Sequence, residues 1–457
     1  MERNAAGRRM VVVSAALLVM GVSLAACSSG SGTGTTTSTS STQSTDAALT
    51  NTGSWPGVGK ICSSGAGGGA TTRGVSAKSI NIATFADPGN TVQPGLNKEF
   101  FQAAQAFSEW CNAAGGINGR KIVVDDRDAA LFNAAQVTNQ ACQQDFMSVG
   151  GGMALDQPAV SVRVACGLGQ ITGFTVSNQA NSASLQVNPS GINNDKIEAG
   201  WYAALAKKYP AAVKHYGTGA ANEQSIIEPT NKWRDAAVAQ GYKQVDYQLV
   251  PLAVTDWTPY VEQAQSKGVL ALQPPTDSTV APYAQAMSTA GYNPTFMLLT
   301  TQYYNQATAQ AAAATHFPTT YLALQYWPFE LASQSPGLQQ LNGIMSKYAS
   351  GDQVDWDDEL AFDSWILFAK SATACGANLT VSCVLSHAAA EQNWTGGGLA
   401  APVAHLALSN DNPTPGDCFL LMTVQPNKFS YDKSVTDPNN QIWHCDPKTV
   451  IPVPVNG

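Results

Sequence analysis

The body of the chain alternates between amphipathic helical stretches and short β-rich runs. In the clearest case, apolar residues recur at helical spacing over 101–114, a glycine pair follows, and 121–124 is typical of a strand. Later segments repeat this order, with helices expected at 233–240, 260–266, 283–290 and 360–373, and strands at 245–250, 269–272 and 296–299. Further strands are expected at 79–85 and 171–176. Strands that alternate with helices predict βαβ units, in which helices cover both faces of a parallel sheet.

The loops that follow these strands are the candidate binding segments. In open α/β sheets, ligands bind beyond the carboxyl ends of the strands. The corresponding loops are 86–89, 150–157, 177–180, 218–225, 274–277 and 300–304. The glycine run 150–152 carries no phosphate-binding lysine and predicts a tight strand exit that a ligand or another backbone approaches closely.

The N-terminus has the pattern of an export signal. Arg3, Arg8 and Arg9 precede an uncharged, largely apolar run at 10–26, which predicts a secretory signal peptide rather than a membrane-spanning helix. The ending Leu24-Ala25-Ala26-Cys27 resembles the bacterial lipobox, which implies that Cys27 receives palmitate-type acyl chains. The alternative is an ordinary signal peptide followed by a coincidental cysteine. We expect a signal peptide at 1–26 and an extracytoplasmic, lipid-anchored protein on the cell membrane.

A polar tether is expected after the anchor. Residues 28–45 are Ser, Thr and Gly apart from Gln43, so they offer no apolar surface to offset the entropy of ordering. The lipid anchor and a disordered tether are therefore expected at 27–75.

Composition restricts the function classes. The 457 residues are 44% hydrophobic and suffice for two lobes, while only 12% are charged. The net charge of −8 and the lack of a basic stretch argue against a nucleic-acid partner. Nine cysteines, of which eight remain after removal of Cys27, favour disulfides in an oxidising compartment.

Signals for catalysis, cofactors or metals are weak. The five histidines are scattered, so no metal site is expected. The motif 217–219 lacks the third glycine of a dinucleotide site, and no cofactor is expected. The acidic groups 125–126 and 357–359 are interpreted as solvated turns or helix caps, with a catalytic pair as the alternative.

Three motifs carry a family resemblance. The segment 112–122, which reads NAAGGINGRKI and is followed by Asp125-Asp126, resembles the signature of type I periplasmic-binding proteins. The segments 255–260 (TDWTPY) and 290–294 (AGYNP) are similar to further motifs of the branched-chain amino-acid type of ABC-transporter receptor. The resemblance covers about residues 76 to 430.

This resemblance implies an α/β fold of two doubly wound parallel-sheet lobes joined by a three-segment hinge. Lobe 1 is expected at 76–195 and 328–400, and lobe 2 at 196–327 and 401–457. The implied function is non-enzymatic: capture of a small molecule in the cleft for an ABC permease. The alternative is a surface sensory or enzymatic lipoprotein on the same scaffold, because fold alone does not set function.

The resemblance also implies where the ligand lies. Family members hold a ligand carboxylate through backbone N–H and hydroxyl groups of two lobe 1 loops, and they neutralise its ammonium with an acid of lobe 2. The matching lobe 2 loop, 300–302, has no carboxylate, so the ligand is expected to be amino acid-like with a substitute acid, an amide, or a small apolar or planar solute. The expected ligand-binding residues are Asp87, Ala154, Leu155, Asp156, Thr175, Ser177, Glu223, Gln224, Gln302, Tyr303, Tyr326 and Trp327. For Thr175 and Ser177 the alternative role is helix capping, and for Trp327 it is core packing.

The disulfide pairing follows from the implied sheet order, in which the second strand lies at the edge. Helix 1 then crosses one face of the first sheet, while helices 2 and 3 cross the other face. Cys142 and Cys166 share a face, whereas a bond from Cys111 to Cys142 would pass through the sheet. The expected pairs are Cys62–Cys111, Cys142–Cys166, Cys375–Cys383 and Cys418–Cys445. The alternative for Cys62, which lies beside the glycine run 65–69, is that it is unpaired.

Overall fold

The computed structural model describes residues 51–275, 280–435 and 442–455, which belong to one compact unit, Leu49–Gly457. The expected signal peptide, Cys27 and the polar run 28–45 lie outside the described residues. The last part of the expected tether, 51–75, is described and is not a free coil, because Trp55, Ile61 and Cys62 are buried against the body and Cys62 is bonded to Cys111. Among the helices of the described part, none is both long enough and apolar enough to cross a membrane.

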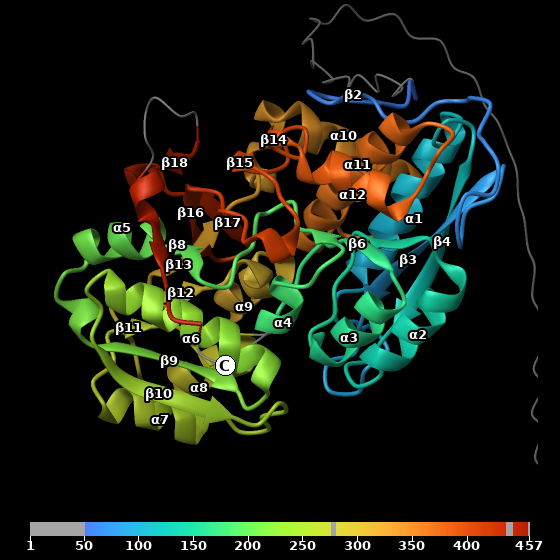
Figure 1. Ribbon diagram of the computed structural model, residues 1–457. Coiled ribbons are helices and arrows are strands. Elements are labelled where there is room, and N and C mark those ends of the chain that lie inside the picture. The colour runs from blue at the N-terminus through green and yellow to red at the C-terminus, as the bar shows by residue number, and fades with distance from the viewer. Residues whose placement is uncertain (1–50, 276–279, 436–441, 456–457) are drawn as a thin grey trace, which may run out of the picture. The chain divides into compact units, whose positions relative to one another are not determined.

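A five-stranded parallel sheet organises one half of the fold (Figure 1). Its order is β4 (Lys121–Asp128), β3 (Ser79–Ala86), β5 (Met147–Val149), β6 (Gly169–Ile171) and β7 (Gln186–Val187). One face packs on α1 (Glu99–Ala113), α11 (Trp356–Cys375) and α12 (Val381–Ala389), and the other on α2 (Ala134–Gln144) and α3 (Gln157–Ala165). Helix α10 (Pro336–Tyr348) packs on α1 and α11. The second strand, β4, lies at the edge, as expected.

An eight-stranded sheet organises the other half. Its order is β10 (Gln244–Val250), β9 (Tyr216–Ala221), β11 (Ala271–Leu272), β12 (Phe296–Leu299), β13 (Thr320–Leu324), β16 (Cys418–Gln425) and β17 (Lys428–Tyr431), with β18 (His444–Cys445) paired to β16. The helices of this half are α5 (Gly200–Lys208), α6 (Gln224–Ala239), α7 (Thr258–Ser266), α8 (Ala281–Ala290) and α9 (Gln306–Ala314). Strands β9 to β13 are parallel, as expected, whereas β16 to β18 add an antiparallel edge that the sequence pattern did not predict.

The chain passes between the two sheets three times, after β7, after β13 and before β16. Smaller elements lie along these passages and at the chain ends: β1 (Ser54–Trp55), β2 (Gly59–Lys60), α4 (Asn178–Asn181), β8 (Lys196–Glu198), β14 (Gln392–Trp394), β15 (Val403–His405) and β19 (Val450–Pro452). Short 3-10 helices are η1 (Ala212–Lys214), η2 (Thr301–Tyr303), η3 (Phe329–Gln334), η4 (Ser409–Asp411), η5 (Lys433–Val435) and η6 (Pro447–Thr449). The fold is therefore the two-sheet α/β architecture that the resemblance implies.

Aromatic packing joins α1 to α11, which are far apart in sequence but adjacent in space (Figure 1). The Phe107 ring stacks on Trp365 with 5.5 Å between centroids and meets the Phe362 ring edge-on at 5.7 Å. All three side chains are buried, and each such burial stabilises the fold by roughly 1.5–3 kcal/mol. This contact ties the returning chain to the first sheet.

The sequence pattern placed one strand wrongly. A strand was expected at 171–176, but β6 ends at Ile171. The Thr172 N–H still donates to the Val187 carbonyl of β7, but the next N–H, of Gly173, donates to the Gly151 carbonyl, so the chain leaves the sheet after Thr172. The tight exit expected at 150–152 is present: Gly150 has φ of 68°, and a Cβ at Gly151 would collide with the Phe85 carbonyl. Residues 172–176 are therefore a loop at the end of a short strand.

Four disulfides link the eight cysteines of the described residues. They are Cys62–Cys111, Cys142–Cys166, Cys375–Cys383 and Cys418–Cys445, the same four pairs as expected. The Cys62–Cys111 bond leaves no unpaired thiol in the entry segment, so the alternative for Cys62 is not seen.

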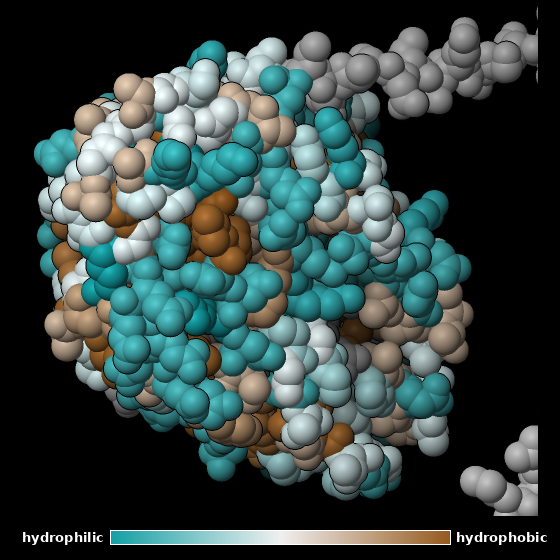
Figure 2. Space-filling model, turned by 90° about the vertical axis from the view of Figure 1, so that its right-hand side faces the viewer, coloured by the Kyte–Doolittle hydropathy of each residue, from teal (hydrophilic) through white to brown (hydrophobic). Residues whose placement is uncertain are grey.

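Hydrophilic side chains cover most of the face shown in Figure 2, and hydrophobic residues lie on it in scattered patches. Because only 12% of the residues are charged, uncharged polar groups supply much of this surface, as the composition indicates.

Candidate functional site

A cavity of about 740 Å³ is lined by residues from both halves of the fold. This volume lies within the range of about 300–1,000 Å³ that is typical of small-molecule sites. Its walls come from the loop after β6, the starts of α1 and α11, helix α6, and the segment from β12 to α9. The cavity therefore opens at the carboxyl ends of several parallel strands, where a ligand site is expected.

The two halves also contact each other beside the cavity. The Asn178 backbone N–H, at the start of α4, donates to the Glu228 carboxylate of α6 at 2.6 Å. A carboxylate is favourable at the N-terminal end of a helix because it accepts an N–H that has no intrahelical partner.

Five of the predicted ligand-binding residues line this cavity. They are Ala154, Thr175, Gln302, Tyr303 and Tyr326. Gln302 and Tyr303 belong to η2, directly after β12, so this loop lies where the sequence placed it. The structure brings these residues together around one space, and their contact with a ligand stays a prediction.

The other seven predicted residues do not line the cavity: Asp87, Leu155, Asp156, Ser177, Glu223, Gln224 and Trp327. Gln224 is exposed and donates to Glu228, whereas Trp327 is buried and donates from its indole N–H to the Leu331 carbonyl. The Trp327 ring also meets Trp443 edge-on, as in the alternative of core packing. A ligand-binding role for these seven residues stays a prediction.

Two internal carboxylates occupy the backbone donors that the resemblance assigned to a ligand carboxylate. Asp87 accepts hydrogen bonds from the N–H groups of Leu131 and Ala154, both at 2.8 Å. Asp156 accepts from Val176 at 2.7 Å and from Ser177 at 3.1 Å. Burial raises the pKa of Asp87, and it raises the pKa of Asp156 to about 6. Both aspartates hold loops together at the strand ends.

The two predicted hydroxyl groups are also engaged within the protein. The Thr175 hydroxyl donates to the side-chain oxygen of Asn181 at 2.6 Å. The Ser177 hydroxyl accepts from the Ala180 N–H at 3.2 Å and so caps α4, which is its alternative role. In this conformation, the N–H and hydroxyl groups that were expected to bind a ligand carboxylate form hydrogen bonds within the protein.

A buried network supports the cavity wall at Tyr326. The Tyr326 hydroxyl donates to Asp363 at 3.0 Å, and the Trp394 indole N–H donates to the same carboxylate at 2.6 Å. Burial raises the pKa of Asp363 to about 7, although these two hydrogen bonds act in the opposite direction. Asp363 thereby links helix α11 to a cavity-lining residue and to β14.

The sequence interpretation missed a group of carboxylates that we call the acidic corner: Glu99, Asp355 and Asp357. All three line the cavity, at the starts of α1 and α11. Asp355, which the sequence interpretation did not single out, caps α11 and accepts from the Asp357 N–H at 3.0 Å. Burial and neighbouring carboxylates raise the pKa of Asp357 well above its ordinary value. Asp357 thus lines the cavity, whereas Asp358 accepts from the Asp355 N–H and takes part in the helix cap expected for residues 357–359.

Two lysines line the same cavity from other elements, Lys196 of β8 and Lys232 of α6. Burial lowers the pKa of Lys232 to about 8, while Asp195 acts in the opposite direction. Aromatic residues complete the lining, namely Phe174, Trp201, Tyr202, Trp233, Tyr303, Tyr304, Tyr326 and Trp356. The cavity therefore combines apolar walls with charges of opposite sign on different elements, an arrangement suited to binding an organic solute.

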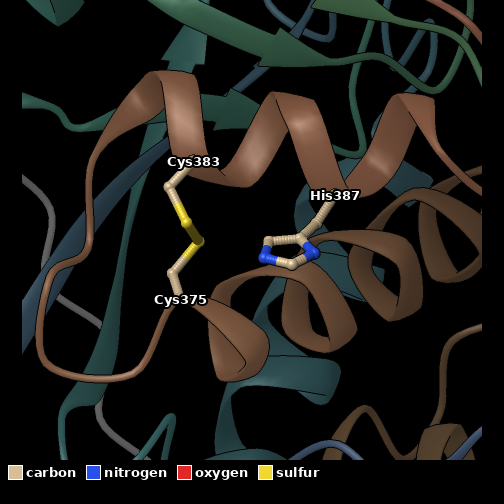
Figure 3. A group of neighbouring side chains, drawn as sticks. All are labelled: Cys375, Cys383 and His387. Carbon is tan, nitrogen blue, oxygen red and sulfur yellow. A yellow bond between two sulfur atoms is a disulfide. The ribbon is translucent and has the colours of Figure 1, made fainter.

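One group among the described residues has the spacing of metal ligands, at Cys375, Cys383 and His387. Their ligand atoms lie within 4.8 Å of one another, and Figure 3 shows the imidazole beside the two sulfurs. The sulfurs are bonded to each other, however, and metal binding requires thiolates. The geometry reflects a disulfide next to a histidine of α12.

Comparisons with known proteins agree with this architecture. The chain belongs to the periplasmic binding protein family, whose sequence model matches residues 92–428. A sequence search of curated proteins found no match. The family expected from the sequence motifs is thus confirmed, and its members are solute-binding proteins of transport systems.

Solved structures show the same fold at low sequence identity. A fatty acid ABC transporter substrate-binding protein from Thermomonospora curvata is 14% identical, with a TM-score of 0.62 over 81% of this chain and 95% of that chain. A leucine-binding protein from Thermotoga maritima is 12% identical, with a TM-score of 0.61 over 79% and 99%. A solute-binding protein from R. palustris in complex with 4-hydroxybenzoate is 14% identical, with a TM-score of 0.61 over 78% and 96%.

Proposed function

We propose that the protein is an extracytoplasmic, lipid-anchored receptor that captures a small organic solute in the 740 Å³ cavity and delivers it to an ABC-type importer. The observation that carries this proposal is the cavity itself, lined from both sheets and located at strand carboxyl ends. Membership of a family of solute-binding transport proteins supports the receptor role. The lipobox-like segment ending at Cys27 supports the anchor.

The binding step rests on closure of two lobes around the cavity. We infer lobe 1 at 76–195 and 328–400, and lobe 2 at 196–327 and 401–457. The three chain passages between the sheets are the natural hinge, because a few residues outside regular elements can absorb the rotation. The residues that we expect to contact the solute are Ala154, Thr175, Gln302, Tyr303 and Tyr326.

The proposal covers several classes of small organic solute. The similar proteins named above include one described as binding leucine and one solved with 4-hydroxybenzoate. The aromatic lining of this cavity suits a solute with an apolar or planar portion.

The proposal is tested by a thermal-shift screen of the mature chain against amino acids, amides, short acids and aromatic compounds. A solute that raises the melting temperature is then added at saturation during small-angle X-ray scattering. We expect the radius of gyration to fall as the lobes close. A stabilising solute that leaves the radius of gyration unchanged contradicts closure.

A matched pair of variants locates the binding. Ala307 lines the cavity and is exposed, so Ala307→Trp should obstruct the cavity without disturbing the core. Ala313 lies on the same helix, is also exposed and does not line the cavity, so Ala313→Trp is the control. Calorimetric titration should show weaker binding for Ala307→Trp alone. Equal affinities in both variants contradict binding in this cavity.

A further inference from the structure

The cavity wall formed by α1 and α11 carries an excess of negative charge. Glu99, Asp355 and Asp357 face a single lysine of the same wall, Lys98. The Lys98 ammonium lies 4.0 Å from the Glu99 carboxylate, and its side chain is 55% exposed, so it neutralises this wall only weakly. Three carboxylates that line one cavity repel one another unless a positive charge joins them.

Asp357 is the member of the acidic corner that lacks a partner. Its carboxylate lines the cavity and forms no hydrogen bond or ion pair with any other described residue. Two residues further along α11, the fully buried Glu359 has two carboxylate oxygens without a hydrogen-bond partner, and Asp358 has one, although neither side chain lines the cavity. Unpaired buried carboxylates are costly, and a bound cation would reduce that cost.

Helix capping accounts for only part of this acidic run. Acids are favourable in the first turn of a helix, and Asp355 accepts N–H groups there. The Asp357 carboxylate accepts none of these N–H groups and lies on the cavity instead. A capping role therefore explains Asp355 but not the placement of Asp357.

We propose that the acidic corner receives the positively charged nitrogen group of the solute, such as a primary ammonium. This inference rests on the proposed function and specifies the solute class. The N–H groups that would bind an anionic group of the solute are occupied, because Ala154 and Val176 already donate to internal carboxylates. A positively charged group on the solute agrees with this. The flanking Trp356 and Tyr304 offer apolar surface for the carbon chain next to the nitrogen.

The spacing of the carboxylates favours an organic cation over a metal ion. Within the described part of the chain, the acidic corner does not form a group of three ligand atoms within 4.8 Å of one another. Hard cations such as Ca²⁺ need six to eight oxygen ligands at about 2.3–2.6 Å. An ammonium group on an organic chain is larger and accepts a looser arrangement of carboxylates.

The test uses probes of one chain length that differ in charge: 1-aminohexane, 1-hexanol, hexanoate and, for a metal ion, CaCl₂. Each is titrated into the mature protein by calorimetry at constant ionic strength. We expect the amine to bind at least about tenfold more tightly than the alcohol or the acid, because a hydrogen bond to a charged group contributes about that much. Asp357→Asn and Glu99→Gln should each lower the affinity for the amine to about that for the alcohol. The control is Asp352→Asn, which removes an exposed acid that does not line the cavity.

The outcomes separate this inference from the proposed function. An amine that binds no better than the alcohol, or equally well to Asp357→Asn and Glu99→Gln, overturns the inference. So does stabilisation by CaCl₂ that depends on Asp357. If none of the probes binds while a neutral or anionic solute from the screen binds and closes the lobes, only this inference is contradicted. If no solute binds at all, both this inference and the proposed function are contradicted.

Discussion

The buried carboxyl of Asp363 makes the stability of the protein depend on pH in a direction that can be worked out. Asp363 is fully buried, and its pKa rises from 3.8 to about 7. An acid with a raised pKa in the folded state stabilises the fold most below its unfolded pKa, and this stability is lost as the pH rises through the folded pKa. One pKa unit corresponds to about 1.4 kcal/mol, so the whole effect is roughly 4 kcal/mol. Roughly 2.5 kcal/mol of this stabilisation is lost as the pH rises from about 5 to about 8.

The perturbation is Asp363→Asn, which removes the titration and retains an oxygen that can accept from Trp394. Urea unfolding of the ligand-free protein, followed by tryptophan fluorescence, gives the free energy of unfolding at each pH. Relative to wild type, the variant should gain roughly 2.5 kcal/mol of stability on going from about pH 5 to about pH 8. Asp411→Asn, at an exposed acid, should follow the wild type throughout. A constant difference between Asp363→Asn and wild type across this range would refute the reasoning.

The remaining predictions concern the anchor, the tail and the cavity. Metabolic labelling with a fatty-acid probe should mark the wild type but not Cys27→Ser, and equal labelling of both would exclude lipidation at this cysteine. Replacing Cys418 and Cys445 together by alanine should lower the free energy of unfolding by about 2–4 kcal/mol in urea denaturation, because the bond closes a loop with a sequence separation of 27; an unchanged midpoint would contradict this. Gln302→Ala should weaken solute binding by about 1–3 kcal/mol in calorimetry, whereas Gln265→Ala, at an exposed residue of α7 outside the cavity lining, should bind as wild type; the reverse order would place the site elsewhere.

Much of the fold could be predicted because its signals are local. Apolar periodicity and glycine placed α8 close to its observed bounds, and Gly291 ends that helix in the left-handed conformation. The disulfides were predictable once the sheet order was set, since only residues on one face of a sheet can approach. The strand expected at 171–176 was wrong because the N–H groups of Gly173 and Val176 bond to Gly151 and Asp156, in a loop distant in sequence, rather than to a neighbouring strand.

The candidate site was only partly predictable because its chemistry depends on contacts between distant segments. No local feature shows that Asp156 reaches the N–H groups of Val176 and Ser177. The acidic run at 355–359 was visible in the sequence, but its burial was not, because that depends on the packing of α11 against α1. Glu99 gave no sequence signal, since it joins the acidic corner only when the chain returns to the first sheet.

The central claim is that a small solute binds in the cavity between the two sheets, and hydrogen–deuterium exchange tests it most directly. The mature chain is compared with and without a saturating solute from the thermal-shift screen. We predict slower exchange in the cavity segments 173–176, 300–306 and 353–357, with no change in helix α7, which lies outside the cavity lining. Unchanged exchange in these three segments, together with protection elsewhere on the chain, would contradict the account.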